Sequence, residues 1–539
     1  MISLMRLDRL RRVEWMVAIL LSLMVLLLIA VRLAHAGALW RDESAVVQLA
    51  RMPHFGDIAR NFQHEAFPVP FPILIRGYTS LFGTGDTALR AFGAAVGVAL
   101  LCAMWFSAEC AGEQLPLISL SLLGLNTTFL VWGLTIRGYG LGSVLITLAF
   151  GLFAGLIRKP SPTSAVAAVL ASVAAVQCLV HNLILLFAMT VSAAAVCLMR
   201  RNSRNLAIFL GILALCAISF LPYLDAYTSG NNWSIVAESP VTFRLLWKEF
   251  ILALGNPNPA FALFWGISFV ILVTAGGWRI YRRRLTRPSP EWDVLLFSTL
   301  LPVAAAVSYY LFLHLLSYLA RPWYFLALLS IVAVSLDCLA AGLVNITWIR
   351  VGRLLFAMAA LMILPFNAWP KIVERQSNID VVAKKVTELA KPADLVVVAP
   401  WQYGVSFTRY YNGAAPWTTL PKIDDLRVHR YDLFREKMIS PHPIDDVLEK
   451  VGQTLEAGNR VWFVGGLKHL HETRAPRLLL PAPDPTVGWD NVAYSQSWLE
   501  QLSAFVHAHG QRGQTIGLPS AGAVNELENV PLIVVDGWQ

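Results

Sequence analysis

The sequence is poor in charged residues. Asp, Glu, Lys and Arg make up 14% of its 539 residues, whereas about 25% is usual in water-soluble globular proteins. The deficit lies in residues 1–370, where apolar runs recur, each roughly 18 to 22 residues long and therefore able to cross a bilayer as a helix. This composition excludes a water-soluble protein and predicts a polytopic membrane protein.

Residues 371–539 lack cysteine altogether, because all six cysteines lie in or beside the apolar runs. This absence excludes a disulfide framework in the tail. The tail also lacks the glycine patterns GxGxxG and GxxxxGK[ST] that cradle phosphates, so we do not predict a nucleotide site. The basic excess belongs to residues 1–370, with 26 Lys and Arg against 15 Asp and Glu. Positive charge in membrane loops sets orientation, so no nucleic-acid partner is expected.

Hydropathy predicts eleven membrane spans. They lie near residues 15–34, 88–107, 115–132, 138–157, 163–180, 183–199, 205–223, 251–276, 292–313, 322–343 and 353–369. The first run, about 20 residues long, exceeds the apolar core of a signal peptide, so we interpret it as a retained span. The strongly basic short loops all fall on one side, at 6–12, 158–159, 200–204, 279–287 and 350–353. That side is expected to be cytoplasmic. The N-terminus is then cytoplasmic and the C-terminal tail extracytoplasmic, in a bacterial-type inner membrane.

The external segment 35–87 opens with an acidic pair, Asp42 and Glu43, in "LWRDESAVVQLA". Apolar residues from Ala45 to Met52 share one helical face, which predicts a helix lying along the membrane surface. Asp42 has two interpretations. It can cap this helix near Ser44, or it can act as a general base for a hydroxyl nucleophile. The two are compatible, because a capping carboxylate keeps a second oxygen.

The tail alternates amphipathic helices with short apolar strands. "IDVVAKKVTELAK" precedes "DLVVVAP", "IDDVLEKVGQTLEAG" precedes "RVWFVGG", and "SWLEQLSAFVHAHG" precedes "PLIVVDG". This alternation predicts a small α/β domain with a mainly parallel sheet over residues 371–539.

Other polar residues also fall at the predicted outer ends of spans. They are Arg137, Tyr139, His181, Asp225, Lys248, Tyr309, Tyr310, His314 and Arg321. Any one of them can simply anchor a helix at the headgroups, but their gathering on one face predicts a site at the outer boundary. Nucleotide sugars are cytoplasmic, so a transferase on this face requires a lipid-linked donor. A sugar on polyprenyl phosphate fits, because cationic side chains can stabilise the leaving phosphate.

"LWRDESAVVQLA", followed by "FPVPFPILIRGYTSLFGTGDTALRAFGAAVGV", resembles the GT-C superfamily of integral-membrane glycosyltransferases. Within it, the sequence is similar to the protein mannosyltransferase, aminoarabinose transferase and rhizobial galacturonosyltransferase relatives. Those proteins carry an acidic motif after the first span, then a proline-apolar segment and a G-x-x-x-x-x-x-R element, which Gly83 to Arg90 matches. "IRGYGL" and "ARPWYFLALL" resemble two further family motifs. The resemblance covers residues 1–370 and hardly extends to the tail.

The resemblance implies a GT-C-like catalytic module over residues 1–370. It implies inverting transfer from a polyprenyl-phosphate sugar to a glycan or glycolipid acceptor in cell-envelope biogenesis, with Asp42 as acid/base and Glu43 assisting. The residues assigned to donor phosphate or substrate are Arg137, Tyr139, His181, Arg321, His64, Glu65 and Lys248. The sequence identifies no cofactor with certainty, and the resemblance allows a divalent metal, with Glu43, His64 and Glu65 as candidate ligands.

The sequence departs from the family pattern in two places. The paired proline is split as Pro68-Val69-Pro70, and the lysine that precedes the pair in aminoarabinose transferases is replaced by Ala66 or Phe67. The sugar-binding-like module of eukaryotic protein mannosyltransferases is also missing, which disfavours a protein acceptor.

Two alternatives stay open from sequence. The first is a polymerase or ligase that uses an oligosaccharide on polyprenyl diphosphate, which more usually has a large late external loop. The second is a lipid-linked-sugar flippase or transporter. A transporter would place charges deep within its spans, and Asp337 stands nearly alone there.

Overall fold

The computed structural model describes residues 2–65, 67–112, 114–226, 241–282, 289–317, 320–343, 347–467, 475–519 and 522–539. Ala66 and part of the basic loop 279–287 therefore lie outside the described residues. The chain divides into two compact units. Unit 1 comprises residues 1–34, 87–224 and 241–372, and unit 2 comprises 35–86, 225–240 and 373–539. The sequence assigned segment 35–87 to the membrane module, whereas in the structure residues 35–86 pack with the tail.

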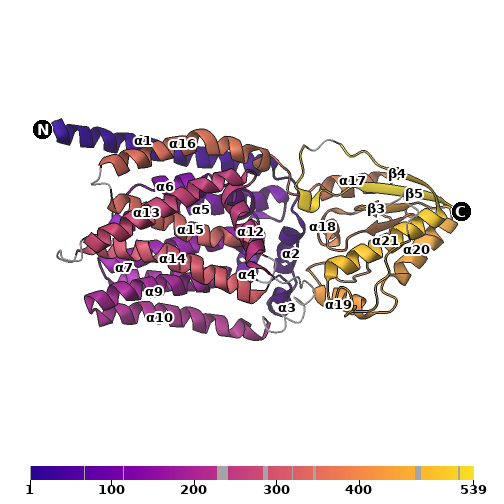
Figure 1. Ribbon diagram of the computed structural model, residues 1–539. Coiled ribbons are helices and arrows are strands. Elements are labelled where there is room, and N and C mark those ends of the chain that lie inside the picture. Colours follow the sequence, from indigo (N-terminus) through magenta and orange to yellow (C-terminus); the bar gives the residue numbers. More distant parts are fainter. Residues whose placement is uncertain are drawn as a thin grey trace. The chain divides into compact units, whose positions relative to one another are not determined.

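Unit 1 is a helical bundle (Figure 1). Within the described residues, nine helices are long and apolar enough to cross a membrane. They are α1 (Ile2–His35), α5 (Asp86–Gly112), α7 (Gly138–Arg158), α9 (Asn182–Arg200), α10 (Ser203–Phe220), α13 (Ala262–Arg282), α14 (Pro290–Leu316), α15 (Leu326–Gly342) and α16 (Thr347–Ile372). A shorter apolar helix, α8 (Pro162–Cys178), matches the predicted span 163–180. The chain is thus a multi-pass membrane protein; the count of eleven spans stays a prediction.

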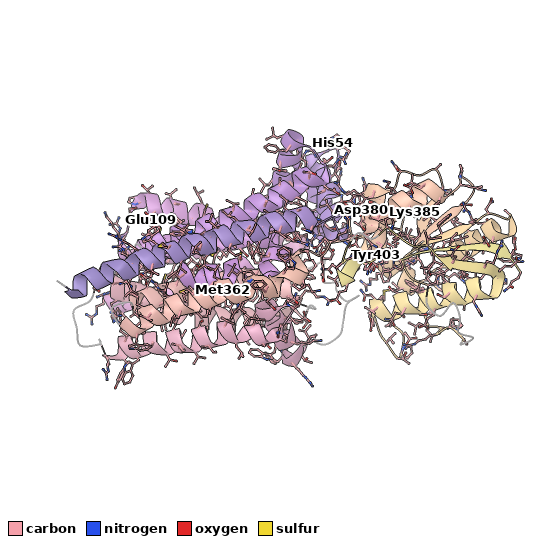
Figure 2. All side chains as sticks on the ribbon, turned by 90° about the horizontal axis from the view of Figure 1, so that it is seen from above. His54, Glu109, Met362, Asp380, Lys385 and Tyr403 are labelled. Atoms are coloured by element: carbon pink, nitrogen blue, oxygen red, sulfur yellow. The ribbon has the colours of Figure 1, made fainter. Side chains whose placement is uncertain are left out.

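Burial distinguishes the centre of the bundle from its periphery. In the most apolar stretch of α15, 94% of the residues are buried, against 17% in the corresponding stretch of the span that contains α10. A helix that is apolar on all sides belongs in the interior of a bundle. Peripheral helices instead expose large apolar side chains, such as Met362 on α16, which is 67% exposed (Figure 2). Such side chains suit contact with lipid.

Two predicted spans are wrong in detail. Residues 115–132 do not form one helix: α6 (Leu117–Ser119) continues as the π-helical turn η2 (Leu120–Gly124), and a second such turn, η3 (Phe129–Gly133), follows after a break. The Asn126 side chain accepts a hydrogen bond from Phe129 N at 2.9 Å, which satisfies a backbone group at the break. It also donates to Ala253 O, in another helix, at 3.0 Å.

The predicted span 251–276 is also divided. α12 (Phe243–Gly255) ends before two prolines, Pro257 and Pro259, and the chain resumes as η6 (Pro259–Phe261) and α13. Proline lacks the N–H that an uninterrupted helix needs. The break therefore follows from residues that the hydropathy pattern alone does not weigh.

Asp337, the carboxylate deep within α15, has a structural partner. Its two oxygens accept hydrogen bonds from Ile118 N at 2.7 Å and Ser119 N at 2.8 Å. These are N–H groups at the start of α6, which a helix leaves unsatisfied. Asp337 therefore caps the start of α6.

Unit 2 contains a five-stranded sheet. Its strands are β1 (Leu395–Val398), β2 (Trp417–Thr419), β3 (Val461–Val464), β4 (Gly510–Thr515) and β5 (Leu532–Trp538), in the order β2-β1-β3-β5-β4. β1 pairs in parallel with β2 and β3, whereas β5 is antiparallel to β3 and β4. The prediction of an α/β domain is confirmed, but the sheet is mixed rather than mainly parallel.

Helices cover both faces of the sheet (Figure 1). Val396 and Val398 of β1 face one core with α17 (Ile379–Leu389), whereas Leu395 and Val397 face the other core. The second core is completed by α19 (Tyr431–Ile439), α20 (Asp445–Glu456) and α21 (Asn491–His509). Successive strand residues point to opposite faces. The amino-acid sequence of a strand that is buried on both faces is therefore a continuous apolar run.

The segment 35–86 contributes four short elements to unit 2. They are α2 (Arg41–Ala50), α3 (Phe55–Asn61), η1 (Phe62–His64) and α4 (Pro70–Phe82). Ala45 lies in the same core as β1 and β3, and Ala38 lies in the opposite core. The Gln48 side chain also donates to Val405 O at 2.8 Å, in α18 (Tyr403–Tyr410). The predicted surface helix thus buries its apolar face against protein within unit 2.

Candidate functional site

The carboxyl edge of the parallel strands in unit 2 gathers polar side chains. Trp401 follows β1, His429 lies in the segment after β2, and Glu528 precedes β5, which is antiparallel to β3. β1 and β3 approach closely there, since a β-carbon at Gly465 (φ +112°) would lie 1.7 Å from Ala399 O. In α/β sheets, ligands bind outside the carboxyl ends of the strands.

The start of α2 is fixed at this edge by Glu528. The buried Glu528 carboxylate accepts from Arg41 N at 2.9 Å, Ser377 Oγ at 2.9 Å and Ser406 Oγ at 2.7 Å. Burial raises the pKa of Glu528, although Arg41 and these hydrogen bonds act to lower it. Burial lowers the pKa of Arg41, but Asp42 and Glu528 raise it overall. The first turn of α2 is therefore held by a carboxylate 487 residues away.

Asp42 and Glu43 have different surroundings in α2. The prediction that Asp42 caps the helix is wrong, because Trp40 is the N-cap residue and Asp42 lies in the first turn. Glu43 is fully buried and accepts from Trp40 N at 3.4 Å. The Asp42 side chain stays 20% exposed, with Oδ1 3.8 Å from Arg41 Nε. Asp42 is the member of the pair that a hydroxyl can reach.

His429, which sequence reasoning missed, lies between two predicted site residues. Its Nδ1 is 2.9 Å from Glu65 Oε1, and its Nε2 is 3.6 Å from Asp42 Oδ1. The backbone N–H of His429 donates to the same Glu65 oxygen at 3.1 Å. Asp42 and Glu65 are thus brought together through a residue of the tail. The only sequence signal was the dense charge of "DDLRVHRYD", residues 424–432.

An ion pair lies beside His64 in the same region. Asp432 binds the Arg430 guanidinium at 2.6 Å and lies 3.9 Å from His64 Nδ1. Burial lowers the pKa of His64, while Asp432 raises it and Arg430 lowers it. The His64 imidazole is therefore predominantly neutral at neutral pH.

Glu43, His64 and Glu65, the candidate metal ligands, do not gather into one cluster. Among the described residues, no group of three or more His, Cys, Asp and Glu side chains is arranged to hold one. Glu65 Oε1 accepts from the backbone and ring of His429, and Glu43 faces the start of α2. These carboxylates are therefore engaged by the protein itself, and we derive no step through a metal.

The remaining predicted residues belong to unit 1. Tyr139 and His181 both contact Tyr324, with ring centroids 5.6 Å apart in each pair. His181 Nδ1 lies 3.5 Å from the hydroxyl of Tyr309, which donates to Tyr324 O. Two of the predicted residues are therefore brought into one aromatic cluster.

The three predicted cations of unit 1 differ in exposure. Arg137 is buried at the N-cap of α7, whereas Arg321 and Lys248 are exposed. Burial raises the pKa of the Glu249 carboxyl, and the positive charges of Arg321 and Lys248 act to lower it. These two cations share a neighbour.

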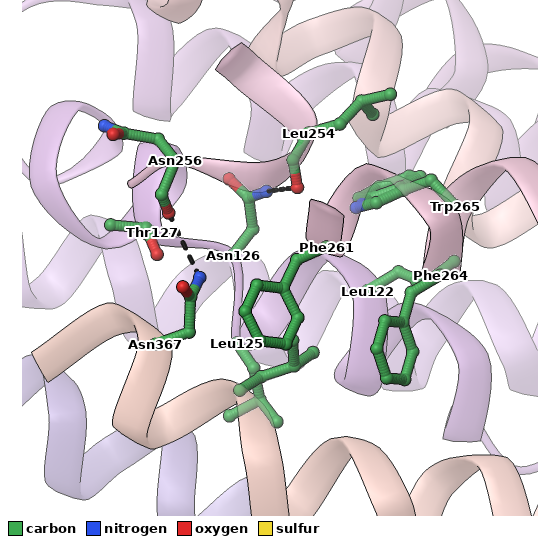
Figure 3. Close-up of a pocket in the computed structure, with 11 residues that line it drawn as sticks. Leu122, Leu125, Asn126, Thr127, Leu254, Asn256, Phe261, Phe264, Trp265 and Asn367 are labelled. Carbon is green, nitrogen blue, oxygen red and sulfur yellow. Dashed lines mark hydrogen bonds between the residues drawn. The ribbon is translucent and has the colours of Figure 1, made fainter. Parts of the chain in front are cut away.

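A small cavity in unit 1 lies where the broken helix at Asn126 meets the loop after α12 (Figure 3). Asn126, Asn256 and Asn367 line it together with Phe261 and Trp265. The centre of a water molecule can occupy about 10 Å³ of this cavity. The cavity therefore has room for about one water. It is too small for a sugar.

No protein-family model and no curated protein matches the sequence. Solved structures do match it. ArnT from Cupriavidus metallidurans in the apo state is 14% identical, with a TM-score of 0.51 over 88% of this chain and 98% of ArnT. The same protein bound to undecaprenyl phosphate is 13% identical, with a TM-score of 0.51 over 83% of this chain and 92% of ArnT.

A second protein of similar fold is the oligosaccharyltransferase of Archaeoglobus fulgidus, tethered to an acceptor peptide. It is 11% identical, with a TM-score of 0.50 over 94% of this chain and 74% of that one. ArnT and this oligosaccharyltransferase are both membrane glycosyltransferases of the GT-C superfamily. The chain therefore has the GT-C fold.

Proposed function

We propose that this protein transfers a single sugar from a polyprenyl-phosphate donor to a hydroxyl of a cell-envelope glycan or glycolipid, on the outer face of the membrane. The GT-C fold supports glycosyl transfer, and one structure of similar fold is bound to undecaprenyl phosphate. The observation that carries the proposal is the position of Asp42. It is a partly exposed carboxylate in the first turn of α2, at the carboxyl edge of the sheet.

In this proposal Asp42 is the general base. It takes the proton of the acceptor hydroxyl while the acceptor oxygen bonds to the sugar's anomeric carbon. The bond from that carbon to the phosphate oxygen breaks, and polyprenyl phosphate leaves with the bonding electrons. Attack from the face opposite the phosphate inverts the anomeric centre. We assign Glu43 to holding the start of α2, because it is buried on Trp40 N.

For the leaving phosphate we propose Arg137 and Arg321, with Lys248, as the sequence predicted. Cations stabilise charge that develops on a phosphate in the transition state. For the acceptor we propose binding by the C-terminal part of unit 2. Its support is the polar edge of the sheet, where α/β domains bind ligands.

The test is Asp42→Asn in the full-length protein. Membranes that contain the protein are incubated with a panel of undecaprenyl-phosphate sugars, and release of undecaprenyl phosphate is measured. We expect the variant to lose release by about a hundredfold or more, at unchanged protein level. Glu43→Gln, which keeps an acceptor oxygen for Trp40 N, is the matched control and is expected to retain most activity. Normal release by Asp42→Asn would disprove the assignment.

A further inference from the structure

The imidazole of His429 lies between two carboxylates of the segment 35–86. Nδ1 is 2.9 Å from Glu65 Oε1, and Nε2 is 3.6 Å from Asp42 Oδ1. The three side chains come from two regions far apart in the sequence, since Glu65 and His429 are 364 residues apart. Such an array is chemically specific, because an imidazole can donate through one nitrogen while it accepts through the other.

Glu65 fixes how the ring is oriented. The Glu65 side chain is 1% exposed, and its Oε1 accepts from both the ring Nδ1 and the backbone N–H of His429. The ring also stacks on Tyr431 at 6.1 Å and meets the edge of Trp401 at 6.4 Å. When Nδ1 carries the ring's single proton, the Nε2 lone pair faces Asp42.

We infer that His429 is a positioning residue that receives the proton from Asp42, and that Glu65 orients it for this role. This inference rests on the proposed function. After Asp42 has taken the acceptor's proton, that proton passes to His429 Nε2 and the Asp42 carboxylate is restored. The imidazolium formed lies beside the Glu65 carboxylate, which stabilises its charge, until it releases the proton to water. The distance of 3.6 Å exceeds a direct hydrogen bond, so a rotation of Asp42 or one bridging water completes the path.

Other charged or titratable groups also face this array. Arg41 lies 3.8 Å from Asp42 on α2, and Tyr431 stacks on the His429 ring. Nearby, Asp432 is paired with Arg430 and lies 3.9 Å from His64. Arginine keeps its charge at every working pH. His429 is therefore the side chain beside Asp42 that can both accept a proton and release it again.

The experiment compares His429→Gln and Glu65→Gln with the wild type in full-length protein, by release of undecaprenyl phosphate across about pH 5 to 8. We expect His429→Gln to lower kcat about tenfold to a hundredfold, to leave KM for the donor unchanged and to abolish the acid limb. Glu65→Gln keeps an oxygen for Nδ1–H but removes the charge. It should therefore move the acid limb to lower pH, because the imidazolium forms less readily.

The matched control is His442→Gln. His442 makes a similar contact with a carboxylate, 2.7 Å to Asp445, but its side chain is 75% exposed. It should show wild-type kcat and pH profile. A wild-type profile in His429→Gln would overturn the inference. If that variant does not accumulate, an unmoved acid limb in Glu65→Gln overturns it instead. Loss of release in Asp42→Asn with normal release in both other variants would leave the proposed function standing.

Discussion

Asp42 and Glu43 are adjacent in the sequence, and helical geometry turns their side chains about 100° apart. One carboxylate is fully buried on a backbone N–H, and the other is 20% exposed beside His429. Two carboxylates in one helical turn therefore have different roles: Glu43 holds the start of α2, and Asp42 can contact a substrate. A substrate hydroxyl cannot reach the buried carboxylate of Glu43, whereas the partly exposed carboxylate of Asp42 stays accessible.

Asp484 shows how hydrogen bonds to a carboxylate affect stability. Its oxygens accept from Thr486 N, Thr486 Oγ, Leu480 N and Val487 N. The Thr486 hydroxyl and N–H lower the pKa of Asp484 to about 2, below its usual value of 3.8. A depressed pKa adds stability that is complete above pH 3.8 and is lost as the pH falls through about 2.

We therefore expect Asp484→Asn to lower the melting temperature of the detergent-solubilised protein at pH 5, where the native carboxylate is charged. As the pH falls from 5 toward 2, the difference between wild type and variant should shrink. The measurement is thermal unfolding followed by tryptophan fluorescence. A difference that is constant over this range would show that the carboxylate charge contributes nothing.

At the scale of elements, α2 depends on a small residue. Ala45 is fully buried in the core that also contains Trp401 and Val405, next to the sheet. A larger side chain at this position would displace α2, and with it Asp42, from the edge of the sheet. Overpacking of a core typically costs about 1–3 kcal/mol.

Ala45→Leu should therefore lower sugar transfer while the protein stays folded in the membrane. Ala457→Leu, the same substitution at an exposed position after α20, is the control and should leave transfer unchanged. The measurement is release of undecaprenyl phosphate together with the melting temperature. Equal activity in both variants would mean that the position of α2 does not limit the reaction.

Sequence predicted those elements whose pattern is local. β1, β3, α17 and α20 were found because their apolar periodicity lies within a few residues. β4 was missed because "GQRGQT" has no apolar alternation, and its exposed strand is specified by pairing with β5. That pairing also explains the error in sheet direction, since β4 follows α21 directly and β5 returns antiparallel beside it.

The candidate site was predicted only in part, for a related reason. Asp42 and Glu65 were found because they lie beside recognisable motifs. His429 and Glu528 were not, because their partners lie 364 and 487 residues away. Pairing at such distances leaves no periodicity in a single sequence.

At the scale of the whole molecule, exposed apolar side chains lie in two different surroundings. Met362 of α16 is 67% exposed in a helix that can span a membrane, whereas Val492 of α21 is 57% exposed in the α/β region. If lipid covers the first and water the second, a charge is costly only at the first. A lysine near the centre of a spanning helix costs about 2.5–3.5 kcal/mol on insertion scales.

Met362→Lys should accordingly reduce the amount of protein recovered in the membrane fraction, and Val492→Lys should not. Quantitative immunoblotting of membrane fractions measures both. Equal recovery of the two variants would contradict contact between α16 and lipid.

The contact between Glu528 and the start of α2 also has a consequence in time. Arg41 leaves the ribosome 487 residues before Glu528, which at about 5–20 residues per second amounts to about 25 to 100 s of synthesis. Throughout that interval the nascent chain has its acidic pair but not the carboxylate that fixes it. A chain that is cut short before β5 would therefore reach the membrane unable to assemble this edge, and catalysis would be confined to finished molecules.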